Sequence, residues 1–120
     1  MKSYTDIEQS KKLAEILPIE SADMCYRIVA YNPNDTHEYQ PYCFSSTLES
    51  DIPCWSLSAL LDVLPDEVGD NHYLTLDKEG KEYCCCYEDN NGNSFRHCFS
   101  DNPADACVTM IEKLHELKML

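Results

Sequence analysis

The sequence is poor in glycine and basic residues, and it lacks the hydrophobic segments of a membrane protein. Three glycines in 120 residues leave no Gly-rich phosphate loop, which excludes nucleotide binding by the usual glycine motifs. No apolar run approaches the ~20 residues that a membrane-spanning helix needs. The opening segment MKSYTDIEQS lacks the apolar core of a signal peptide, so we expect a cytoplasmic protein without membrane contact.

Nine Lys and Arg residues stand against 22 Asp and Glu residues, which gives a formal net charge of −13 at pH 7. A surface of this sign repels phosphate backbones and anionic lipids, so we expect no direct nucleic-acid or membrane binding. It would attract a basic protein, including the nucleic-acid site of another protein. The alternative is that the charge only keeps the chain dispersed in solution.

Eight cysteines are the main excess in the composition. Because no export signal is present, we interpret them as reduced structural thiols, which behave as small hydrophobes, rather than as a disulfide framework. The paired C-x-x-C ligands typical of a zinc site are absent from the sequence. A metal or redox site on one hairpin remains an alternative, and its candidate residues are Cys84, Cys86, His97 and Cys98.

The sequence contains no recognisable catalytic constellation. His97 and Cys98 are adjacent in a predicted strand, so their side chains face opposite sides and cannot cooperate as base and nucleophile. No spacing among the 22 carboxylates singles out an acid/base pair. We therefore predict a protein that is not an enzyme and that requires no cofactor.

Apolar residues repeat at helical spacing in three segments. Thr5 and Glu8 have the spacing of a capping box at the start of the first segment. Ser56 is placed to cap the second segment, while Asn102 and Pro103 open the third. We therefore predict helices over residues 6–17, 57–64 and 102–120.

Five segments rich in β-branched and aromatic residues predict strands. With the helices they give the order α-β-β-α-β-β-β-α, which indicates an α+β fold. We predict a single domain over residues 1–120, with one antiparallel sheet of about five strands and three helices packed mainly on one face. The predicted strands are 24–31, 39–47, 72–77, 82–89 and 94–99.

Two hairpin signals, Glu79-Gly80 and Asn91-Gly92, predict the register of the last three strands. We take each dipeptide as a two-residue loop. The strands then place Cys85 opposite Cys98, Cys86 opposite His97, Leu74 opposite Cys85 and Leu76 opposite Tyr83.

Neither face of these predicted hairpins is polar. Three helices cover one face of a sheet, so the second face is expected to be partly apolar and exposed, or buried against a partner. A β-bulge that shifts the register by one residue is an equally open explanation. We predict a partner-binding surface made of the uncovered face and an acidic loop, with Leu74, Leu76, Tyr83, Tyr87, Asp66, Glu67 and Asp70.

Two segments carry a family resemblance: EQSKKLAEILPIESADM, residues 8–24, and IPCWSLSALLDVLP, residues 52–65. Their E-Q-S-x-x-L, S-A-D-M and P-x-W-S-L-S-A-L-L patterns resemble small proteins encoded by prophages and other mobile elements of anaerobic gut bacteria. The Ala-rich C-terminal helix of those proteins corresponds to PADACVTMIEKL, residues 103–114. The resemblance implies a phage-related accessory role and brings no known activity.

The sequence therefore predicts an accessory protein that acts through an unknown protein partner, either a basic protein or a second copy of the chain. A specific version is an acidic mimic of nucleic acid, which requires carboxylates clustered on one face. Two alternatives stay open. One is a metal- or redox-dependent cysteine protein, and the other is a structural virion component that forms oligomers.

Overall fold

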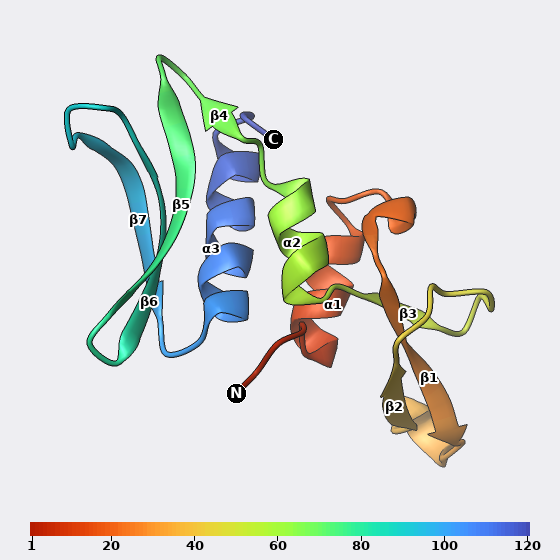
Figure 1. The fold of residues 1–120 in the computed structure, drawn as a ribbon. Coiled ribbons are helices and arrows are strands. Elements are labelled where there is room, and N and C mark those ends of the chain that lie inside the picture. The colour runs from red at the N-terminus through yellow and green to blue at the C-terminus, as the bar shows by residue number, and fades with distance from the viewer. The chain divides into compact units, whose positions relative to one another are not determined.

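The computed structural model describes residues 1–34 and 36–120 in full, and its backbone contacts divide the chain into two compact units. Unit 1 comprises Met1–Ser3 and Leu60–Leu120, and unit 2 comprises Tyr4–Ala59. Figure 1 labels the elements of both. The α+β class is confirmed, but the single five-stranded sheet is wrong, because the strands form a three-stranded and a four-stranded antiparallel sheet. The single-domain assignment stays a prediction.

Unit 2 contains the three-stranded sheet, in the order β2-β1-β3. The sequence analysis missed β3, whose three residues with a central proline are too short to show alternation. Because β3 takes the free edge of β1, the first sheet is complete without the later strands. The elements are α1 (Ile7–Ala14), η1 (Ile19–Ser21), β1 (Met24–Ala30), η2 (Pro33–Asp35), β2 (Glu38–Tyr42) and β3 (Ile52–Cys54).

The capping box of α1 lies one residue further along the chain than predicted. The Asp6 carboxylate accepts a hydrogen bond from the Gln9 backbone N–H at 2.8 Å, and the Gln9 side chain accepts one from the Asp6 N–H at 3.0 Å. Thr5, the predicted cap, is buried instead. Its Oγ1 lies 2.7 Å from Ser10 Oγ and accepts a hydrogen bond from the Trp55 backbone N–H.

Side-chain hydrogen bonds connect the sheet of unit 2 to the segments around it. The buried Tyr26 hydroxyl donates to the Thr5 carbonyl at 2.7 Å, and Trp55 Nε1 donates to Ser21 Oγ at 2.9 Å. Arg27 donates to both carboxylate oxygens of Asp51, at 3.0 and 2.8 Å. The hydrogen bonds from Arg27, helped by two backbone N–H donors and opposed by burial, lower the pKa of Asp51 to about 2.

Unit 1 contains the four-stranded sheet, in the order β4-β5-β6-β7. The predicted caps of its long helix are confirmed: Asn102 accepts from the Asp105 N–H at 2.8 Å, and Pro103 is the first helical residue. Ser56 caps α2 as predicted, by accepting from the Ala59 N–H at 3.2 Å. The elements are α2 (Leu57–Val63, shared with unit 2), β4 (Glu67–Val68), β5 (His72–Glu79), β6 (Glu82–Glu88), β7 (Ser94–Ser100) and α3 (Pro103–Glu116).

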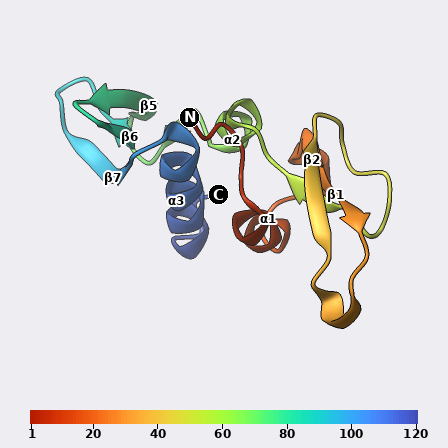
Figure 2. The ribbon, with the colours of Figure 1, turned by 90° about the horizontal axis from the view of Figure 1, so that it is seen from below.

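Helix α3 covers one face of the β5–β7 sheet, as Figures 1 and 2 show. Cys107, Met110, Ile111 and Leu114 are fully buried at the spacing of one helical face. Among the described residues, no helix combines the length and the apolar character needed to cross a lipid bilayer.

The predicted register of β5 and β6 is wrong by two residues. Leu74 pairs with Tyr87 and Leu76 with Cys85, because the two-residue loop is Gly80-Lys81 rather than Glu79-Gly80. Gly80 has a φ of +64°, a conformation that glycine adopts without steric cost. A shift of two residues leaves every side chain on its predicted face, since strand side chains alternate with a period of two.

The predicted register of β6 and β7 is confirmed in its centre, where Cys85 pairs with Cys98 and Cys86 with His97. The predicted two-residue Asn91-Gly92 loop is wrong, because the ladder already ends at the pair of Glu88 and Ser94. A bulge makes up the difference: Arg96, with a φ of +57°, lies between the pairs Cys86–His97 and Tyr87–Phe95. Uninterrupted alternation from the predicted register would place Phe95 on the face of His97 and Phe99, but the bulge places it on the face of Tyr87.

Candidate functional site

The face of the β5–β7 sheet that points away from α3 is the candidate site, here called the open face. The face is identified by Cys85, which contacts Cys107 of α3, so the alternate residues Cys84 and Cys86 point the other way. Cross-strand pairing arranges the open face in four rows: Tyr73–Glu88–Ser94, Thr75–Cys86–His97, Asp77–Cys84–Phe99 and, at the β5–β6 turn, Glu79–Glu82.

Polar atoms surround the thiol at the centre of the open face. Cys86 is only 1% exposed because it lies on a central strand, between the side chains of Thr75 and His97. Thr75 Oγ1 is 3.0 Å from Cys86 Sγ, which donates to Glu88 Oε1 at 3.5 Å. The sulfur of Cys86, a carboxylate oxygen of Glu88 and a ring nitrogen of His97 all lie within 4.8 Å of one another.

Burial raises the pKa of the Cys86 thiol to about 12, with smaller contributions from its acidic neighbour Glu88. Burial also raises the pKa of Cys84, which lies in the adjacent row. Both thiols are therefore protonated at neutral pH, and neither is an activated nucleophile. A bound cation would favour the thiolate of Cys86, because a coordinated thiol is deprotonated.

Two exposed aromatic side chains lie at opposite corners of the open face. Tyr73 is 43% exposed and Phe99 is 48% exposed. The His97 ring is 5.7 Å from that of Phe99, in an edge-to-face arrangement. Asp77 occupies a third corner, toward the end of β5, and Glu88 lies next to Tyr73 on the central strand β6, so the face is both apolar and acidic.

The predicted metal or redox set is divided between the two faces. Cys84, Cys86 and His97 share the open face, whereas Cys98 pairs with Cys85 on the α3 side and is 4% exposed. Sequence reasoning missed Glu88, although the alternation of Cys84, Cys86 and Glu88 along β6 is a readable signal for three donors on one face.

The predicted partner-binding residues lie elsewhere in unit 1. Leu74, Leu76, Tyr83 and Tyr87 occupy the face that α3 covers. Tyr87 is 0% exposed and donates to the Pro65 carbonyl at 2.8 Å, so its side chain is part of the core in this structure. The acidic residues Asp66, Glu67 and Asp70 are exposed around β4.

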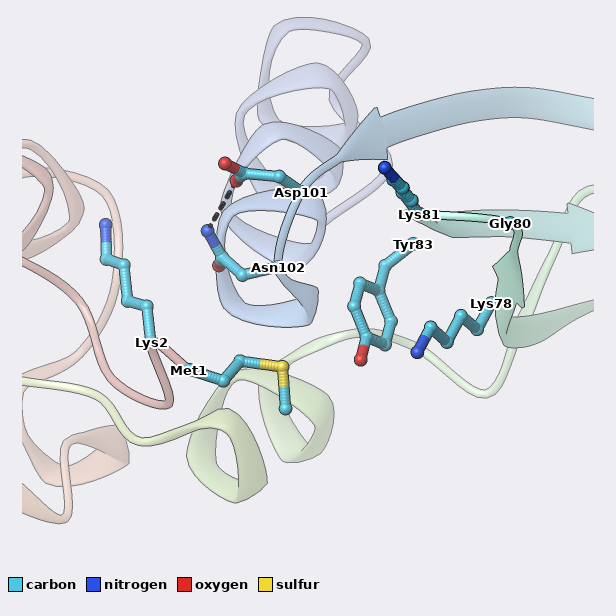
Figure 3. A pocket seen from close by; sticks show the side chains of 8 residues that line it. All are labelled: Met1, Lys2, Lys78, Gly80, Lys81, Tyr83, Asp101 and Asn102. Atoms are coloured by element: carbon cyan, nitrogen blue, oxygen red, sulfur yellow. Dashed lines mark hydrogen bonds between the residues drawn. The ribbon is translucent and has the colours of Figure 1, made fainter.

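A pocket of about 490 Å³ lies at the end of the hairpin between β5 and β6 (Figure 3). Lys2 pairs with Asp105 at 2.7 Å, and the Lys78 ammonium lies 5.6 Å from the centre of the Tyr83 ring. Because Asp105 pairs with Lys2, the positive charge of Lys2 in the pocket is compensated. The lining residues are Met1, Lys2, Lys78, Gly80, Lys81, Tyr83, Asp101 and Asn102.

Comparisons of the chain with protein-family models, curated proteins and solved structures find no match. The functional argument for this chain therefore rests on its own residues.

Proposed function

We propose that the chain is a non-enzymatic accessory protein of a prophage or mobile element, and that it binds a basic protein through the open face. The phage context rests on the resemblance carried by residues 8–24 and 52–65. The binding role rests on one observation: two exposed aromatic side chains share a sheet face with the carboxylates of Asp77 and Glu88.

The aromatic corners supply the apolar contact area. Tyr73 and Phe99 each keep more than two fifths of their surface exposed, and aromatic side chains carry much of the binding energy in protein interfaces. They lie on β5 and β7, the two strands that flank β6 in one sheet, so a partner can contact both without a change in the backbone. A surface formed by paired strands loses little conformational entropy when a partner binds, which favours affinity.

The charge determines the chemistry of the partner. Asp77 and Glu88 lie on the same sheet face as the aromatic residues, and the whole chain has a net charge of −13. A partner surface rich in Lys or Arg would be attracted over a distance of about 10 Å at moderate salt. The proposed partner is therefore a protein with a basic, partly apolar surface.

The nucleic-acid mimic is the less supported version of this function. It requires carboxylates concentrated on one surface, but the acidic residues are divided between the units, with 13 in unit 1 and nine in unit 2. Competition with duplex DNA distinguishes the two versions. DNA displaces the chain only from a partner whose basic surface is itself a nucleic-acid site.

Affinity capture with tagged chain from a nuclease-treated bacterial lysate tests the proposal. We expect a basic protein to be retained by the wild type, released by salt, and lost when Tyr73→Ala and Phe99→Ala are combined. The matched control is Tyr31→Ala, because Tyr31 is an aromatic residue of unit 2 with 73% exposure.

Retention of the same partner by the double variant would disprove the role of the open face. Recovery of only the chain itself or of phage structural proteins would instead favour the virion component. Sedimentation of the purified chain identifies that case, since a virion component forms oligomers.

A further inference from the structure

We propose that the open face binds one zinc ion through Cys86, Glu88 and His97. The three donors come from two paired strands: Cys86 and Glu88 alternate along β6, and His97 pairs directly with Cys86 from β7. This inference does not depend on the proposed partner, since it concerns only the chemistry of the three side chains.

The geometry requires little rearrangement. The three donor atoms lie within 4.8 Å of one another, and the donors of a tetrahedral zinc site are about 3.5 Å apart, given bond lengths of about 2.0 to 2.3 Å. Glu88 is half-buried and His97 is exposed, so both side chains can turn toward the thiol. Cys86 is buried on the central strand, so the site forms by rotation of the Glu88 and His97 side chains toward it.

The donor types select the metal. A thiolate, an imidazole and a carboxylate are the three side-chain ligands of zinc in proteins, whereas calcium and magnesium prefer oxygen donors alone. The thiolate and the carboxylate together neutralise the two positive charges of the ion. On binding, the Cys86 thiol releases its proton to solvent.

The surroundings of the sulfur also suit a metal ligand. Thr75 Oγ1, 3.0 Å from Cys86 Sγ, can donate a hydrogen bond to a coordinated thiolate. Three protein ligands leave the fourth position of the ion to water, on the exposed side of the sheet. Simple core packing explains the burial of Cys86, but it does not explain why a carboxylate and an imidazole both lie beside the thiol.

Titration with Co²⁺ tests the site, because a cobalt–thiolate bond gives a near-ultraviolet charge-transfer band that carboxylate and imidazole ligands do not give. The chain is purified under reducing conditions and without chelators, and Zn²⁺ is then added to displace the cobalt. We expect one Co²⁺ per chain, a thiolate band and full displacement by one equivalent of Zn²⁺.

Single variants identify the ligands. His97→Gln and Glu88→Gln should each weaken Co²⁺ binding at least about tenfold, and Cys86→Ser should abolish the thiolate band. The matched controls are His115→Gln on α3 and Cys43→Ser, which remove an exposed imidazole and the exposed thiol. Both should bind as the wild type does.

Two results would overturn the zinc site. One is wild-type binding no tighter than that of His97→Gln, with both proteins giving the same circular dichroism spectrum. The other is a thiolate band that survives Cys86→Ser or disappears with Cys43→Ser, since the metal would then be held by a different cysteine.

Discussion

The two units stabilise their sheets in different ways. In unit 1 the long helix α3 buries Met110, Ile111 and Leu114 against the sheet, so apolar burial dominates. In unit 2 an ion pair and side-chain hydrogen bonds add to an apolar cluster that includes Met24, Ile52 and Cys54. Arg27 pairs with Asp51, and Tyr26 donates to the Thr5 carbonyl. Apolar burial is insensitive to pH, whereas an ion pair is not. The comparison can therefore be tested by substitution and by acid.

The largest effect is expected from Ile111→Ala in unit 1. The substitution leaves a cavity under α3 and should lower the free energy of unfolding by about 2 to 5 kcal/mol. Urea unfolding is followed by far-ultraviolet circular dichroism, which reports both units, and by the fluorescence of Trp55, which lies in unit 2. We expect both signals to shift together, because α2 spans the boundary and makes half-unfolding of the chain costly.

The exposed His115→Ala on the same helix is the control and should change stability by less than about 0.5 kcal/mol. A circular dichroism transition that moves while the Trp55 transition stays in place would contradict the single-domain prediction. It would make the two units independently folding domains.

The second-largest loss in the free energy of unfolding is expected from Asp51→Ala in unit 2. Loss of the carboxylate removes the acceptor of Arg27 Nε and of two backbone N–H groups and leaves Arg27 only its bond to Thr47, which should cost about 1.5 to 3 kcal/mol at pH 7. Because the pKa of Asp51 falls to about 2 in the folded state, its contribution is complete above the ordinary value of 3.8. It is lost as the pH falls toward 2.

Urea unfolding at pH 7 and pH 2.5 measures this dependence. The difference between wild type and Asp51→Ala should shrink at the lower pH, while that between wild type and Ile111→Ala should stay constant. An Asp51 effect that is equal at both pH values would show that packing, rather than the ion pair, stabilises this part of unit 2.

A smaller effect is expected from Tyr26→Phe. The variant keeps the ring in the core but removes the hydroxyl that bonds the Thr5 carbonyl at 2.7 Å, so it should cost about 0.5 to 1.5 kcal/mol. Tyr31→Phe is the control, and we expect no measurable change there because that side chain is exposed. Equal melting temperatures for Tyr26→Phe and wild type would show that this hydrogen bond does not contribute measurably to the stability of unit 2.

The smallest perturbation is thiol labelling of the wild type. All eight cysteines are free and Cys43 alone is exposed, so one thiol per chain should react rapidly with an aromatic disulfide reagent at pH 7.5. The others should react only as the chain opens, since buried thiols are inaccessible and inert. Mass spectrometry identifies the labelled residue. Rapid labelling of Cys98 would show that α3 separates readily from the sheet.

Sequence reasoning predicted those parts of the fold that depend on local signals. Asn102 with Pro103, and Ser56, identify helix starts because capping is a contact within a few residues. The division into two sheets depends on the pairing of β3 with the edge of β1, which is a contact between residues far apart in the sequence. The three residues of β3 carry no periodicity that would predict it. The β5–β6 turn could not be placed from the sequence either. Glycine suits both positions of a two-residue turn, so Gly80 does not distinguish a Glu79-Gly80 loop from the Gly80-Lys81 loop that forms.

The candidate site was predicted in part. The pairing of Cys86 with His97 followed from an assumed two-residue loop, and it holds because the bulge at Arg96 compensates for the longer loop. That compensation could not be read from the sequence, because arginine at positive φ has no local signature. Which face α3 covers also depends on tertiary packing, so the exposed aromatic residues Tyr73 and Phe99 could not be separated from the buried Tyr87.

The bulge at Arg96 has a further consequence for behaviour at high concentration. It interrupts the outer strand β7, while β4 at the opposite edge is only two residues long and the end of β5 carries Asp77, Lys78 and Glu79. Irregular, short and charged edges are poor templates for strand pairing between molecules. Resistance to fibre growth is thus built into the backbone of this sheet, and it should persist in salt concentrations that screen the negative charge of the chain.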